Sequence, residues 1–106
     1  MQNTIEKIQN EIKADKIVVF MKGTPESPQC GFSARTVEIF KSLGHPFHTV
    51  DILANPDIRA TLPQVSHWPT FPQVFVEGKL IGGCDIVSEM YEQGELQSLL
   101  KETFKK

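Results

Sequence analysis

The sequence predicts a single α/β domain with a small four-stranded mixed sheet flanked by helices on both faces. A continuous β-branched run at residues 17–21 is typical of a strand buried on both faces. About 25 residues with a helical pattern separate this run from a second strand-like segment, which suits a right-handed β-α-β crossover. Further along, Glu77-Gly78 lies between two strand-like runs and indicates a two-residue hairpin.

The N-terminal segment predicts an amphipathic helix that leads into the first strand. Isoleucines recur on one helix face, with charged residues between them, at Ile5, Ile8 and Ile12. The strand at residues 17–21 follows directly. Because that run is short and wholly apolar, we expect it in the middle of the sheet.

A loop and a helix connect the first strand to the second. Glycine and proline residues mark the loop at residues 23–29. The helical pattern over residues 32–43 ends at Gly44. Residues 47–52 then predict the second strand.

The remaining segments predict a third helix, the hairpin and closing helices. Pro56 favours a helix start, and we expect Pro63 to end that helix early. The hairpin strands are predicted at residues 73–76 and 79–82, and the closing helices at 85–93 and 95–104. The order α-β-α-β-α-β-β-α-α indicates a thioredoxin-like arrangement.

Composition and charge argue against several classes of function. The net charge of −2 gives no reason to expect nucleic acid or an acidic membrane as a partner. No apolar run approaches the roughly 20 residues that a membrane helix needs, and Met1–Lys13 lacks the apolar block of a secretory signal. Two cysteines are too few for a disulfide scaffold, so we expect a reducing, cytoplasmic location.

Cys30-Gly31-Phe32-Ser33 is a redox-type turn that contains only one sulfur. A cysteine between a strand and a helix lies at the helix N-terminus, where free N–H groups and the helix dipole favour the thiolate. Ser33 stands where a resolving cysteine would be, so an outside thiol must finish a redox cycle or complete the ligands of a metal. Two plainer roles stay open: Cys30 as a packed, buried residue and Ser33 as a helix N-cap.

Four blocks in the chain resemble the CGFS monothiol glutaredoxins: Lys22-Gly23-Thr24-Pro25, Cys30-Gly31-Phe32-Ser33, Trp68-Pro69-Thr70-Phe71-Pro72-Gln73 and Gly82-Gly83-Cys84-Asp85. The resemblance covers essentially all of residues 1–106, as one glutaredoxin domain, and is closest to the short bacterial members. It implies the glutaredoxin form of the thioredoxin-like fold, glutathione binding, and a 2Fe–2S cluster held between two subunits for iron–sulfur cluster assembly and transfer.

Counting ligands favours a shared cluster. A 2Fe–2S cluster usually takes four thiolates, and each chain offers a single accessible one, at Cys30. Two chains and two glutathione molecules complete the set, so we expect a homodimer with the cluster and a monomer without it. The resemblance further implies a BolA-like protein and apo iron–sulfur acceptor proteins as partners.

The resemblance also implies which residues hold glutathione. Lys22 and Arg59 match contacts to one carboxylate, although each is otherwise an ordinary surface charge. Gly83, Cys84 and Asp85 lie at the start of a predicted helix, so their backbone N–H groups can hold the other carboxylate. Asp85 either accepts the α-ammonium group of glutathione or caps the helix.

The peptide bond between Phe71 and Pro72 is expected to be cis on the same resemblance, with the Phe71 backbone pairing with glutathione like an added strand. An ordinary proline at the start of a strand is the alternative. Cys84 has three roles open: pairing with Cys30, ligating metal, or packing beside glutathione. Trp68 is either core or part of a docking surface.

Three functions remain open for these residues. In a cluster carrier, Cys30 ligates iron and acceptor thiols take the cluster by ligand exchange. In a glutathione-dependent oxidoreductase, Cys30 attacks a protein–glutathione mixed disulfide and a second glutathione regenerates it. In an adapter, the chain pairs with a BolA-like regulatory protein. The absence of a resolving thiol at Ser33 and the long loop at residues 23–29 favour the carrier, with weak reductase activity as a secondary possibility.

Overall fold

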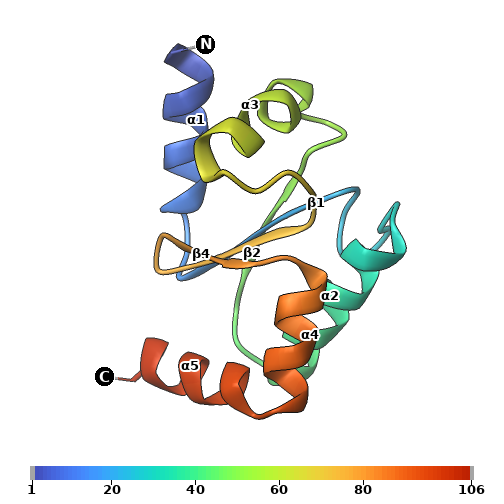
Figure 1. Cartoon of the computed structure of the whole chain (residues 1–106), viewed down its shortest axis with the longest axis vertical. Helices are drawn as coiled ribbons and strands as arrows, with labels where there is room; N and C mark the ends of the chain where they lie inside the picture. The colour runs from blue at the N-terminus through green and yellow to red at the C-terminus, as the bar shows by residue number, and fades with distance from the viewer. Residues whose placement is uncertain (1, 106) are drawn as a thin grey trace.

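The computed structural model describes residues 2–105 and has the order of helices and strands that the sequence predicts (Figure 1). Four strands form one mixed sheet: β1 (Ile17–Met21), β2 (His48–Asp51), β3 (Gln73–Val76) and β4 (Lys79–Gly82). Their order across the sheet is β2-β1-β3-β4, with β1 parallel to β2 and the other neighbours antiparallel. This is the predicted thioredoxin-like fold, with β1 inside the sheet.

Helices cover both faces of the sheet, and Figure 1 shows them as separate layers. On one side lie α1 (Gln2–Ile12) and α3 (Pro56–Ser66), which contact each other. On the other side lie α2 (Gly31–Leu43), α4 (Cys84–Glu92) and α5 (Glu95–Thr103). No helix within residues 2–105 combines the length and apolar character that crossing a membrane requires.

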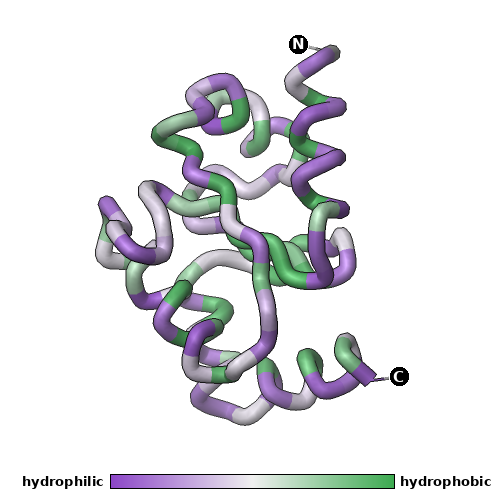
Figure 2. Tube along the Cα trace, turned by 180° about the vertical axis from the view of Figure 1, so that it is seen from behind, coloured by the Kyte–Doolittle hydropathy of each residue, from purple (hydrophilic) through white to green (hydrophobic). Residues whose placement is uncertain are grey.

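Strand β1 contributes to two cores at once. All five of its side chains are buried, as expected for a central strand. Ile17, Val19 and Met21 pack into the core beneath α2, α4 and α5, whereas Val18 and Phe20 pack into the core beneath α1 and α3. Figure 2 shows apolar residues gathered in the middle of the molecule, between the two groups of helices. The two-residue periodicity of a strand therefore divides one apolar run between two layers.

Helix α3 contradicts the prediction that Pro63 ends it early. The helix continues to Ser66, with Pro63 in its interior, and closes at His67 in a left-handed conformation. A proline at this position has no N–H for the carbonyl of Arg59 four residues earlier. Ile58 and Leu62 are fully buried against the sheet, and this packing outweighs the one missing hydrogen bond.

The turns of the second half agree with the sequence. Glu77 and Gly78 both have positive φ angles, of 50° and 81°, as a tight hairpin turn between β3 and β4 requires. Gly94 separates α4 from α5 with a φ angle of 78°. The antiparallel pairing of β3 and β4 brings the start of α4 next to the start of β3, and α4 also contacts α2.

Candidate functional site

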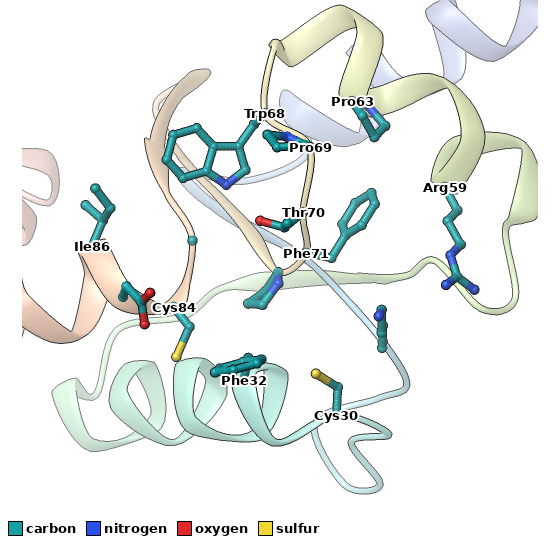
Figure 3. A pocket seen from close by; sticks show the side chains of 14 residues that line it. Cys30, Phe32, Arg59, Pro63, Trp68, Pro69, Thr70, Phe71, Cys84 and Ile86 are labelled. Atoms are coloured by element: carbon teal, nitrogen blue, oxygen red, sulfur yellow. The ribbon is translucent and has the colours of Figure 1, made fainter.

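A cavity of about 610 Å³ lies where the loop after β1, the start of α2, the α3–β3 segment and the start of α4 meet (Figure 3). All eight residues singled out from the sequence line it: Cys30, Lys22, Arg59, Phe71, Pro72, Gly83, Cys84 and Asp85. The structure thus brings together residues that lie far apart in the chain, while the part each plays in binding stays a prediction.

Cys30 is the N-cap residue of α2 and is only partly buried, so its sulfur is accessible from the cavity. The pKa of its thiol lies below the ordinary value, chiefly because the backbone N–H of Ser33 hydrogen-bonds the sulfur. The Phe32 N–H, the charge of Lys22 and the Ser33 hydroxyl lower the pKa further, against the opposing effect of burial. This environment favours a thiolate, which is the form that acts as nucleophile or metal ligand.

A metal bound at Cys30 would need ligands from outside the chain. Within residues 2–105, no three His, Cys, Asp or Glu side chains are close enough together to hold a metal ion. Cys84 lines the same cavity, and its sulfur lies 3.8 Å from the Ser88 hydroxyl. In the view of Figure 3, the Phe32 ring lies between the sulfur atoms of Cys30 and Cys84.

Ser33 is not the N-cap of α2, because Cys30 occupies that position. The Ser33 side chain is fully buried, and its Oγ accepts a hydrogen bond of 3.1 Å from the backbone N–H of Lys22. The residue that replaces a resolving cysteine therefore also joins α2 to the loop after β1.

Two cationic side chains border the cavity without a partner of opposite charge. Lys22 follows β1, and Arg59 projects from the first half of α3 (Figure 3). Among the ion pairs formed within residues 2–105, none involves Lys22 or Arg59. Both cations are therefore available to an anionic ligand in the cavity.

The start of α4 forms the opposite wall. Gly83 is its N-cap residue and no side chain caps the helix, so N–H groups of the first turn remain available. Asp85 is exposed and lies in that first turn, so the helix-capping alternative for Asp85 is wrong.

The peptide bond between Phe71 and Pro72 is cis, as predicted. Gln73, a residue that the sequence did not single out, supports the segment before this bond. Its side chain is fully buried, and its Nε2 donates hydrogen bonds to the carbonyl oxygens of Trp68, at 2.8 Å, and Thr70, at 3.2 Å. The only sequence signal was its place at the end of the Trp68–Gln73 block.

Further side chains of the cavity wall were also not predicted to belong to the site. They are Pro63, Pro69, Thr70 and Ile86. Phe32 and Ile86 are apolar yet 61% and 40% exposed, which places two large hydrophobic side chains at the opening. Trp68 lies in the cavity wall, as part of the site and outside the two main cores.

Comparison with known proteins gives consistent matches. A family model described as Glutaredoxin matches residues 17–81. Glutaredoxin 4 of Escherichia coli (strain K12) is 58% identical over 103 residues, which are 97% of this chain and 90% of that protein.

Two solved structures share the fold. The crystal structure of a buckwheat glutaredoxin–glutathione complex aligns with a TM-score of 0.84 and 32% identity, covering 96% of this chain and 91% of that one. The crystal structure of the holo form of glutaredoxin C1 from Populus tremula x tremuloides aligns with a TM-score of 0.88 and 26% identity, covering 99% and 93%.

Proposed function

The chain belongs to the glutaredoxin family, with the CGFS sequence of its monothiol members, and from this we propose that it binds glutathione and carries a 2Fe–2S cluster between two subunits. The observation that carries the proposal is one accessible, low-pKa cysteine in a cavity bordered by two unpaired cations. Residues 1–106 would act as one domain in a reducing cytoplasm, delivering clusters to apo iron–sulfur proteins.

Glutathione suits the charges of the cavity. Lys22 and Arg59 would bind one carboxylate, and the N–H groups at the start of α4 would bind the other. Asp85 would accept the α-ammonium group, and the Phe71 backbone would pair with the peptide. Each charge-assisted hydrogen bond contributes roughly 1.5–3 kcal/mol, so after ordering a flexible tripeptide we expect micromolar to millimolar affinity. The glutathione complex of the buckwheat relative supports this assignment.

The cluster would be cargo, held by Cys30 from each of two chains and by the thiolates of two glutathione molecules. The donor chemistry fits, because the environment of Cys30 favours its thiolate. Phe32 and Ile86 at the opening would be covered when two chains face each other. Loss of the cluster would release two monomers, and a BolA-like protein or an apo acceptor could then occupy the same face.

A thiol oxidoreductase is the second candidate, favoured by the same lowered pKa of Cys30. The Cys30 thiolate would attack the glutathione sulfur of a mixed disulfide, releasing the protein thiolate and forming a Cys30–glutathione disulfide. A second glutathione would attack that bond, freeing Cys30 and leaving as glutathione disulfide. Ser33 cannot resolve the intermediate from within the chain.

One anaerobic preparation separates the two functions. The chain is reconstituted with iron, sulfide and glutathione, and its visible absorption, metal content and mass are measured together. A coloured dimer containing two glutathione molecules supports the carrier, and a colourless monomer that turns over a mixed disulfide supports the oxidoreductase. Metal that is fully retained after glutathione has been dialysed away would contradict the shared-ligand proposal.

A further inference from the structure

The backbone around Lys22 is held by groups from three other segments. The Lys22 N–H donates to Ser33 Oγ at 3.1 Å, and the Lys22 carbonyl accepts from the Gln29 N–H at 2.9 Å. The next N–H, that of Gly23, donates to Asp51 Oδ1 at 2.9 Å. The two residues that follow β1 are thus fixed by α2, by the end of the loop and by β2, although they belong to no helix or strand.

Ser33 reaches Lys22 from inside the protein. Its side chain is fully buried, and Ser33 lies in the first turn of α2, three residues after Cys30. Because the Lys22 N–H is satisfied by this one oxygen, removing the hydroxyl leaves a backbone donor without its acceptor. The bond therefore couples the position of Lys22 to the helix that carries Cys30.

Asp51 acts from the opposite side. Asp51 is paired with Met21, the residue before Lys22, at the end of the ladder between β1 and β2. Its Oδ1 also accepts from the Leu53 N–H at 2.9 Å, and its backbone carbonyl accepts from Asn55 Nδ2 at 2.8 Å. A carboxylate held in this way is a rigid acceptor for the Gly23 N–H.

We propose that Ser33 and Asp51 are positioning residues for glutathione, because together they fix the backbone from which the Lys22 side chain reaches a carboxylate of the ligand. This inference rests on the proposed function, since it takes Lys22 as a glutathione contact. A lysine side chain loses much conformational freedom on binding. A fixed backbone limits that loss to the side chain itself, which is the advantage of preorganisation.

The test measures the Kd of reduced glutathione for the metal-free full chain by calorimetric titration. Ser33→Ala and Asp51→Ala are each expected to raise Kd about fivefold, the ratio that one ordinary hydrogen bond contributes. Thr36→Val is the matched control. Thr36 is also fully buried in α2, but its hydroxyl donates to the Phe32 carbonyl within the same helix. Its loss should lower thermal stability and leave Kd unchanged.

A double-mutant cycle shows whether Ser33 acts through Lys22. In a Lys22→Met background, Ser33→Ala should have no further effect on Kd. In an Arg59→Met background the fivefold effect should persist, because Arg59 belongs to α3 and is not held by Ser33. A merely structural role of Ser33 would weaken binding equally in both backgrounds.

The outcomes separate this inference from the proposed function. If the unaltered chain does not bind glutathione, the proposed function fails and the inference fails with it. If the chain binds glutathione but Ser33→Ala and Asp51→Ala bind equally well, only the inference is overturned. An equal loss in the Lys22→Met and Arg59→Met backgrounds overturns it too. Should Ser33→Ala fail to fold, the same cycle run with Asp51→Ala decides the outcome.

Discussion

The indole of Trp68 lies directly against the backbone of Gly83, and both residues form part of the cavity wall. A Cβ placed on Gly83 would be 3.3 Å from Trp68 Nε1 and 3.0 Å from the carbonyl oxygen of Pro72. Both distances are shorter than ordinary van der Waals contacts to a methyl group. The glycine at the start of α4 therefore lets the helix approach the segment that contains the cis peptide bond.

Gly83→Ala should push the start of α4 away from Pro72 and misplace the N–H groups of Cys84 and Asp85. We expect glutathione to bind about tenfold more weakly, the loss of roughly one charge-assisted hydrogen bond. Calorimetric titration and thermal unfolding measure the two effects. Gly31→Ala is the control for stability, because a Cβ at Gly31 meets nothing within 4 Å. A Gly83→Ala chain with unchanged affinity would contradict the close-approach argument.

The lowered pKa of Cys30 predicts an early rise of reactivity with pH. In a metal-free Cys84→Ser chain, alkylation by iodoacetamide should reach half its maximal rate at a lower pH than in an unstructured cysteine peptide. Lys22→Met should raise this midpoint, because the charge of Lys22 lowers the pKa of Cys30. Lys79→Met, on the distant β4, is the control.

The same shift has a consequence for stability. Because the native pKa of Cys30 is depressed, the thiolate is favoured in the folded state. Its contribution to the free energy of unfolding is present above the pKa of the unfolded chain and is lost as the pH falls through the native value. If the alkylation midpoint of the Cys84→Ser chain equals that of the cysteine peptide, both the early rise of reactivity and this pH dependence of stability are refuted.

Cys30→Ser should abolish cluster binding, since the carrier model has no other protein ligand. Anaerobic reconstitution followed by visible absorption tests this, and glutathione binding to the metal-free variant should persist through the contacts at Lys22, Arg59 and α4. Cys84→Ser is the matched control: it should keep a normal spectrum if Cys84 only packs beside the ligand. A cluster spectrum in Cys30→Ser would rule out the ligand assignment.

Ser33→Cys should gain dithiol behaviour and retain a reconstituted cluster for a shorter time. A sulfur at this position can resolve a Cys30–glutathione disulfide, and it is a poorer acceptor than oxygen for the Lys22 N–H. Turnover of a glutathione mixed disulfide and the decay of cluster absorbance are the measurements. If turnover equals that of the unaltered chain, the missing second thiol does not explain the function.

Much of the fold was predictable because its signals are local. The apolar run of β1, the Glu77-Gly78 turn and the glycines after α2 and α4 each determine their own conformation. The prediction for Pro63 was wrong because the force that keeps α3 helical comes from Ile58 and Leu62 packing on the sheet. Local sequence carries no information about that contact.

The site was predictable only where motif residues contact the cavity directly. The one-sulfur turn located Cys30 and the resemblance located Lys22 and Arg59, whereas residues that support the backbone of the site were missed. Asp51 accepts a hydrogen bond from the backbone N–H of Gly23 after β1, and Gln73 donates to backbone carbonyls of the segment that precedes it. Such partners are defined by the folded backbone, so the type of side chain alone does not reveal them.

Strand β1 is shared by the two hydrophobic cores, because its alternate side chains pack into different ones. Neither layer of helices can melt by itself without exposing that strand, so the chain should lose its structure in a single step. Amide hydrogen exchange would then be slowest at residues 18–20, and exchange there should match global unfolding. The lysine that follows the strand would consequently lose its position only when the whole domain unfolds.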